Sequence, residues 1–133
     1  MGTLRALNES EVMLTDLRED LRGREVRDIA GEKIGTVDEV LVDDREKQVR
    51  LVLVGAGGFL GLENTQVLIP VDAIIRITDA EVYIRRTRRH AAGAPLYDSR
   101  LVDQRYLESV YAYYGYYPYW APCYSYPRHP AFP

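Results

Sequence analysis

The sequence predicts a mainly β fold, a small barrel or sandwich, and three observations support this prediction. Short runs rich in valine, isoleucine and leucine follow one another closely between Leu21 and Arg86. Polar or glycine-containing turn signals separate these runs, a pattern typical of small barrels and sandwiches. The chain of 133 residues is long enough for one domain and leaves little room for a second.

The first three predicted strands lie at the start of this region. Residues 21–28 form the first strand. Residues 35–44 form the second, because β-branched residues dominate the run and turn signals flank it on both sides. Residues 48–54 follow after a short polar turn, so the second and third strands are predicted to form a hairpin. Both faces of the third strand carry apolar residues, which predicts that the strand is covered on both sides.

The remaining predicted strands are shorter. Residues 66–70 form a strand that stops at its terminal proline, because proline lacks the backbone donor that a ladder needs. Residues 71–74 are predicted to turn into a strand at residues 75–78, and a tight turn leads to the last strand at residues 81–86. Closing these strands into a barrel would remove exposed sheet edges.

Composition divides the chain into three predicted segments. Residues 1–17 are rich in acidic groups and are predicted to be a flexible leader. Residues 18–89 hold most of the valine, isoleucine and leucine and are predicted to be the folded β domain. Residues 90–133 hold most of the eleven tyrosines and are predicted to form a short helix and a tail rich in tyrosine and proline.

The helix is predicted at about residues 98–114, with Asp98 or Ser99 as its N-cap and Gly115 as its stop. One apolar stripe then contains Val102, Tyr106, Val110 and Tyr113. Two interpretations of the tail stay open. In the first, the stripe packs on the barrel or on a second subunit. In the second, the aromatic residues present an extended contact surface to a partner, with these further candidates: Tyr114, Tyr117 and Trp120.

Two strings of residues resemble the PRC-barrel family. The pattern G-x-x-I-G-x-V-x-x-V-x-V-D occupies residues 31–43, and V-L-I-P-V occupies residues 67–71. The resemblance covers about residues 18–86, in a family that includes the cytoplasmic domain of the photosynthetic reaction-centre H subunit and the C-terminal domain of a ribosome maturation factor. It implies a PRC-type, six-stranded β-barrel over residues 18–89. It also implies a role in assembly or as an adaptor rather than catalysis.

A glycine-rich loop at residues 55–61 is the first candidate site. A phosphate-binding P-loop needs a lysine after its last glycine, and here Leu62 follows Gly61. The loop is therefore interpreted as a long turn. Phe59 and Leu60 within it are candidate contact residues.

Metal and catalytic sites are not predicted. The acidic residues Asp38, Glu39, Asp43 and Asp44 lack the ligand spacing of a calcium-binding loop, so they are interpreted as a solvated strand face and turn. The two histidines and the single cysteine, Cys123, show no spacing that indicates a nucleophile and base. We therefore expect no enzyme activity and no cofactor.

A basic cluster follows the last predicted strand and contains Arg85, Arg86, Arg88 and Arg89. One interpretation is a surface patch that binds RNA, an acidic protein or anionic lipid. The other is a solvated strand end and linker, which the net charge of −3 favours.

The leading hypothesis is a non-enzymatic protein-interaction or adaptor module that forms a homodimer and binds an unidentified protein. The alternative is an RNA- or ribosome-associated assembly factor that uses the basic cluster, and a peripheral membrane module is a third class. A lone cysteine indicates a reducing, cytoplasmic compartment. No apolar run reaches the roughly 18 residues needed to span a bilayer.

Overall fold

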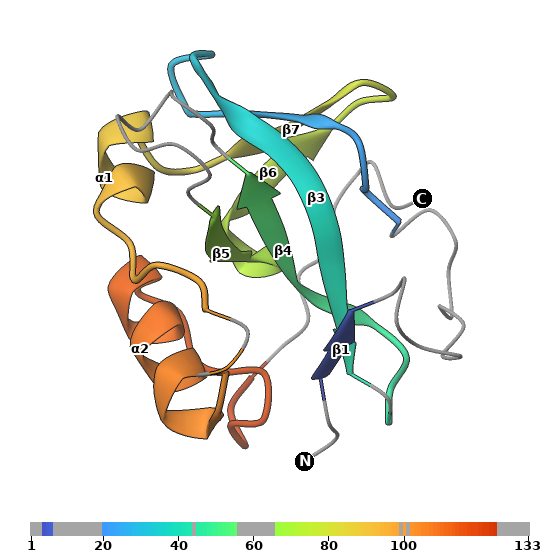
Figure 1. Cartoon of the computed structure of the whole chain (residues 1–133), viewed down its shortest axis with the longest axis vertical. Coiled ribbons are helices and arrows are strands. Elements are labelled where there is room, and N and C mark those ends of the chain that lie inside the picture. Colours follow the sequence, from blue (N-terminus) through green and yellow to red (C-terminus); the bar gives the residue numbers. More distant parts are fainter. Residues whose placement is uncertain are drawn as a thin grey trace.

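The structure is a computed structural model that describes residues 4–6, 20–43, 45–55, 66–98, 100 and 102–124. Strands dominate, and two helices lie along one side of the sheet (Figure 1). In chain order the elements are β1 (Leu4–Ala6), β2 (Glu25–Arg27), β3 (Lys33–Asp43), β4 (Val49–Gly55), β5 (Gln66–Pro70), the 3₁₀ turn η4 (Val71–Ala73), β6 (Ile74–Ile77), β7 (Glu81–Ile84), α1 (Arg88–Ala92) and α2 (Gln104–Tyr114). The prediction of a mainly β fold with a C-terminal helix is confirmed.

The strands form one mixed sheet in the order β5-β4-β3-β2-β7-β6, with β1 added beside β3. Neighbours are antiparallel except for β2 and β7, which are parallel. The six strands of this path match the predicted number, but the sheet is not closed into a barrel. The outer side of β5 instead meets the segment before α2, where Val67 bridges to Leu96 and the Tyr97 amide donates to the Gln66 carbonyl. That segment occupies the edge that closure would need.

The hairpin of β3 and β4 is the centre of the core. Val40 faces Val52 and Leu41 faces Leu51 across the pair. Residues 49–54 are all buried, which confirms that β4 is covered on both sides. Lys47 adopts a left-handed conformation (φ 58°) in the turn that joins the two strands.

The larger differences from the predicted strands lie before β2, after β7 and in the N-terminal segment. The strand predicted at residues 21–28 is limited to β2, because Gly23 (φ 86°) lies in a turn directly before it. The strand predicted to reach Arg86 ends at Ile84, and Thr87 then caps α1 by accepting the amide of His90 at 3.0 Å. Within the predicted flexible leader, β1 pairs with the end of β3.

The cap of α2 is also corrected. Asp103 accepts the Tyr106 amide at 2.8 Å and is the N-cap, whereas Asp98 accepts the backbone amide and guanidinium of Arg100. Ser99 lies outside the described residues. Gly115 ends the helix with φ 83°, as predicted.

The buried face of α2 is rotated relative to the predicted stripe. Leu107, Val110, Tyr111 and Tyr114 are buried in the same core as the sheet. Tyr106 and Tyr113 lie half-buried at its margins, and Val102 precedes the helix. α2 therefore supplies part of the same hydrophobic core as the sheet. In the part of the chain that the structure describes, neither helix is long and apolar enough to cross a bilayer.

Candidate functional site

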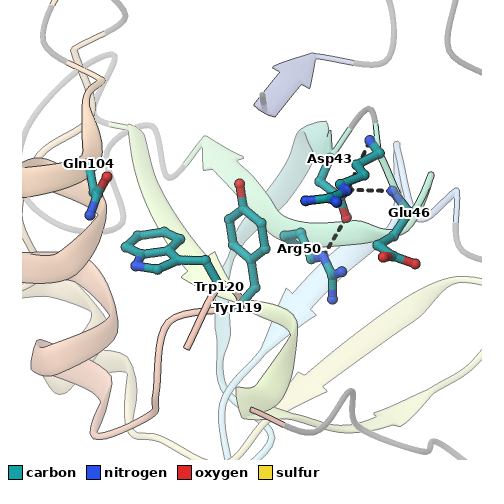
Figure 2. Close-up of a pocket in the computed structure, with 7 residues that line it drawn as sticks. Asp43, Glu46, Arg50, Gln104, Tyr119 and Trp120 are labelled. Atoms are coloured by element: carbon teal, nitrogen blue, oxygen red, sulfur yellow. Dashed lines mark hydrogen bonds and ion pairs between the residues drawn. The ribbon is translucent and has the colours of Figure 1, made fainter. Parts of the chain in front are cut away.

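An open hollow of about 420 Å³ lies between the turn that joins β3 to β4 and the segment after α2 (Figure 2). We call it the aromatic hollow. The hairpin turn and the start of β4 form one wall, and two aromatic residues of the C-terminal segment form the other. Its lining residues are Asp43, Arg45, Glu46, Arg50, Gln104, Tyr119 and Trp120.

A buried ion pair forms the floor of the aromatic hollow. Arg50 Nε donates to Asp43 Oδ2 at 2.6 Å, and both side chains are almost fully buried. The other carboxylate oxygen, Asp43 Oδ1, accepts the backbone amides of Arg45 at 3.1 Å and Glu46 at 2.6 Å. One carboxylate therefore neutralises Arg50 and also fixes the turn at the rim.

The Arg50 guanidinium also holds the C-terminal segment against the sheet. It lies 5.0 Å from the ring centroid of Tyr119 and 5.7 Å from that of Tyr124, within the range of cation–π attraction. Trp120 meets Tyr119 edge to face at 5.1 Å and Tyr111 at 6.1 Å. These ring contacts give the aromatic wall a defined position.

Polar atoms without a partner lie near the floor. Asp72 Oδ1 and the hydroxyl oxygens of Tyr111 and Tyr124 are buried and have no hydrogen-bond partner among the described residues. Burial raises the pKa of Asp72 above its usual value, while the nearby Tyr124 and Arg50 oppose that rise. Burial likewise raises the pKa of both tyrosines above the usual value.

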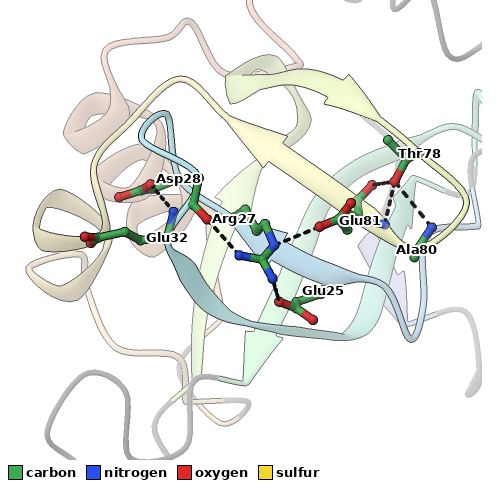
Figure 3. A network of polar contacts seen from close by, with 8 residues as sticks. Glu25, Arg27, Asp28, Glu32, Thr78, Ala80 and Glu81 are labelled. Carbon is green, nitrogen blue, oxygen red and sulfur yellow. Dashed lines mark hydrogen bonds and ion pairs between the residues drawn. The ribbon is translucent and has the colours of Figure 1, made fainter.

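A second polar network joins β2 to β7 (Figure 3). Arg27 donates to Glu81 Oε2 at 2.8 Å and to the Gly31 carbonyl at 2.7 Å, and it pairs with Glu25 at 2.5 Å. These side chains are about one third exposed, so each ion pair contributes at most about 1 kcal/mol. The network stabilises the parallel pair of strands and offers no buried reactive group.

Asp28 ties the turn after β2 to the start of α1. Its Oδ1 accepts the amides of Ala30 and Glu32, both at 2.8 Å, and its Oδ2 accepts the amide of Arg88 at 2.9 Å. Burial alone would raise the pKa of Asp28, but these backbone donors outweigh burial and hold the pKa below its usual value.

We expect Asp28→Asn to lower the free energy of unfolding by about 1–2 kcal/mol at pH 7, because charged acceptors form the stronger hydrogen bonds. The carboxylate's contribution is complete above its unfolded pKa of 3.8 and is lost as the pH falls through the lower folded pKa. Urea unfolding of both proteins between pH 7 and pH 2 tests this. The prediction would be contradicted if the difference in free energy of unfolding between the wild type and Asp28→Asn were the same at pH 2 as at pH 7.

The basic cluster is divided between different environments. Arg85 and Arg89 are exposed, whereas Arg86 and Arg88 are half-buried. Arg86 donates to the Tyr114 carbonyl at the end of α2 and lies over the Tyr116 ring at 5.1 Å. At least one arginine of the predicted patch is therefore engaged in holding the C-terminal segment.

We expect Arg86→Ala to lower the free energy of unfolding by about 1–2 kcal/mol, because it removes a charged donor from a helix C-terminus and a cation–π contact. Arg85→Ala is the matched control, since that side chain is exposed, and it should change stability by less than about 0.5 kcal/mol. Thermal unfolding of the two variants at equal concentration distinguishes them. Equal stability would show that the contact with Tyr114 is not stabilising.

The predicted aromatic contact residues fall into three groups. Val110 and Tyr114 are buried in the core, so they do not present a surface in this fold. Tyr117 is 65% exposed. The half-buried group comprises Val102, Tyr106, Tyr113 and Trp120, of which only Trp120 lines the aromatic hollow. Burial raises the pKa of Tyr106 to about 12.

Two further predictions concern the loop and the acidic residues. Phe59 and Leu60 lie outside the described residues. Among the described acidic residues, Asp38 accepts the Gln66 side-chain amide at 3.0 Å. Glu39 and Asp43 are buried, and Asp43 pairs with Arg50, so the prediction of a solvated face is wrong for these two residues. Within the described ranges, no three acidic, histidine or cysteine side chains are placed to hold a metal ion.

Sequence analysis did not name Arg45, Glu46, Arg50 and Gln104 as members of the site, and it did not single out Tyr119 within the predicted aromatic tail. Arg50 carried a signal, because it is the single charged residue inside an otherwise apolar strand. A charge in such a strand is buried only with a partner, and Asp43 lies at the far side of the same hairpin turn. Tyr119 carried only the signal of the tyrosine-rich tail as a whole, and Gln104 carried none.

The fold and site together define a small β domain with an aromatic surface hollow and a C-terminal helix in its core. The chain belongs to the PRC-barrel family. The sequence model of the PRC-barrel domain matches residues 14–90, which is more than half of the chain. The match includes all the strands from β2 to β7. A comparison with curated proteins gives no match.

Proposed function

We propose that this chain is a non-enzymatic protein-interaction module that self-associates and acts as an adaptor for a second protein. Membership of the PRC-barrel family supports the proposal, because the resemblance implies a domain used for contact. We place the protein in the cytoplasm, a reducing compartment in which the exposed thiol of Cys123 stays free.

The aromatic hollow is the observation that carries this proposal. Tryptophan, tyrosine and arginine supply most of the binding energy at protein interfaces, and the hollow contains Trp120, Tyr119 and Arg50. These side chains are already held in place by the Asp43 ion pair and by ring contacts. A prepared surface of this kind loses little conformational entropy when a partner binds.

The buried carboxylate of the aromatic hollow has a structural rather than a catalytic role. General acid–base chemistry needs a titratable group within reach of a substrate. Asp43, on the floor, uses both oxygens in structural hydrogen bonds to the hairpin turn and Arg50. Its role is therefore to position the binding surface.

The mass of the full chain in solution tests the proposal. We expect sedimentation equilibrium to give a mass that rises from monomer to dimer as the protein concentration increases. A monomer at every concentration up to the millimolar range would reject self-association. A chain that stops at Arg89 is unsuitable for this test, because it lacks the core residues Leu107, Val110, Tyr111 and Tyr114.

A further inference from the structure

Resting on the proposed adaptor role, we propose that the outer face of β2, β7 and β6 binds an acidic segment of the second protein. We call this surface the arginine–tyrosine face. It is formed by Ile29, Arg76, Tyr83 and Arg85. The segment that it binds is a short extended stretch in which carboxylates alternate with apolar side chains.

The strand register places an arginine on each side of a tyrosine. Arg27 on β2 is paired with Tyr83 on β7, and Arg76 on β6 is paired with Tyr83 from the other side. Burial alternates along β7, because Val82 and Ile84 are buried whereas Tyr83 is half-buried. The row of three side chains therefore lies on the side of the sheet that faces away from the core.

Two more exposed residues extend this face at the end of β7. Arg85 is exposed, and its amide donates to the Ala73 carbonyl at 2.8 Å, so the strand pairing continues to this position. Arg85 is then a diagonal neighbour of Arg76, about 7–8 Å away. The Ile29 amide donates to the Arg86 carbonyl at 3.1 Å, and the Ile29 side chain is 56% exposed. An apolar side chain thus lies beside the same end of β7.

Positive charge remains on this face after its internal ion pairs are counted. Arg27 is neutralised by the two glutamates of the network that joins β2 to β7 (Figure 3). Arg76 lies over the Tyr83 ring at 5.2 Å. In the described part of the chain, no carboxylate forms an ion pair with Arg76 or Arg85. These two guanidinium groups are therefore available to a carboxylate from outside.

The pattern of charge favours an acidic protein segment over a nucleic acid. A nucleic acid strand carries a phosphate at every nucleotide, so beyond the arginines it would cross the two glutamates that flank Arg27. The net charge of −3 adds to that repulsion. A short peptide segment can place carboxylates only where Arg76 and Arg85 receive them, in the forked geometry that guanidinium groups favour. Its apolar side chains would cover Tyr83 and Ile29.

Binding of a synthetic acidic peptide tests the arginine–tyrosine face. The probe is a fluorescein-labelled decapeptide of alternating glutamate and leucine, and fluorescence anisotropy measures its binding to the full chain. We expect Arg76→Glu and Arg85→Glu each to weaken binding by at least about tenfold, because each replaces an attraction by a repulsion. Raising the salt concentration from about 50 mM to about 300 mM should weaken wild-type binding by at least about threefold.

Arg105→Glu is the matched control, because it makes the same change of charge at an exposed position of α2. α2 packs against β5, which lies at the opposite end of the sheet order from β6. This variant should bind the peptide within about twofold of wild type, since the charge lies outside the proposed face. All three variants replace exposed side chains and should keep a melting temperature close to that of wild type. A decapeptide with glutamine in place of glutamate should bind at least about tenfold more weakly than the acidic one.

The contrary outcomes are distinct from a failure of the proposed function. The inference is rejected if wild type does not bind the acidic peptide at concentrations up to the millimolar range. It is also rejected if Arg76→Glu and Arg85→Glu bind the peptide as tightly as wild type. A ten-nucleotide oligouridylate that binds more tightly than the peptide, and less tightly to both variants, would assign the face to nucleic acid instead. Sedimentation equilibrium judges self-association separately, so a chain that dimerises without binding the peptide rejects this inference alone.

Discussion

Replacing Arg50 by alanine is expected to lower the free energy of unfolding by about 3–5 kcal/mol. The substitution leaves the Asp43 carboxylate buried and without its cation, and an uncompensated buried charge is strongly destabilising. It also removes the group that lies over Tyr119 and Tyr124, so the C-terminal segment loses an anchor. Urea unfolding at pH 7, followed by circular dichroism, measures the effect.

Two comparisons isolate the cause. Arg89→Ala removes an exposed arginine and should change stability by less than about 0.5 kcal/mol. The double variant Asp43→Ala/Arg50→Ala removes both charges, and we expect it to be more stable than the sum of the two single effects predicts. A loss below about 1 kcal/mol for Arg50→Ala would show that the ion pair does not stabilise the fold.

The strands were predictable because their signals are local. In β4 the apolar run lies between a polar turn and glycines, and its composition alone indicates a strand with both faces covered. α1 was missed because its five residues include Arg88, Arg89 and His90, which suggest a charged linker. Its formation depends on the Thr87 cap and on Asp28, which lies far away in the sequence.

The face of α2 was mispredicted for a geometric reason. Asp98 and Asp103 are both good N-cap residues, and the sequence alone does not decide between them. Each residue turns a helix by about 100°, so nearby choices of apolar stripe face different directions. The stripe with Tyr106 and Tyr113 and the buried face with Leu107 and Tyr114 differ by one residue. Packing against β5 selects the second.

The aromatic hollow could be predicted only in part. Trp120 was a candidate because exposed tryptophan is common at interfaces. Its assembly with Arg50 and Gln104 required contacts between residues that lie tens of positions apart in the sequence. Such contacts follow from the docking of α2 and the C-terminal segment, which no local pattern specifies.

We expect Tyr111→Ala to lower the free energy of unfolding by about 3–5 kcal/mol, the usual cost of removing a buried aromatic side chain. Tyr111 is fully buried between α2 and the sheet, and its ring contacts Trp120. The variant should therefore also disturb the wall of the aromatic hollow. A shift of the tryptophan fluorescence emission maximum to longer wavelength, relative to the wild-type protein, would report this disturbance.

Tyr111→Phe separates the ring from its hydroxyl group. That hydroxyl is buried without a hydrogen-bond partner among the described residues, so the folded state bears its desolvation cost. Removing it should leave the free energy of unfolding unchanged or raise it by up to about 2 kcal/mol, measured by urea unfolding beside Tyr111→Ala. If phenylalanine destabilises the protein by more than about 1 kcal/mol, the hydroxyl must gain a stabilising contact in solution. The cluster around Asp72 and Tyr124 would then act as a polar anchor for the C-terminal segment. Hydrogen bonds as well as ring packing would stabilise that segment against the sheet.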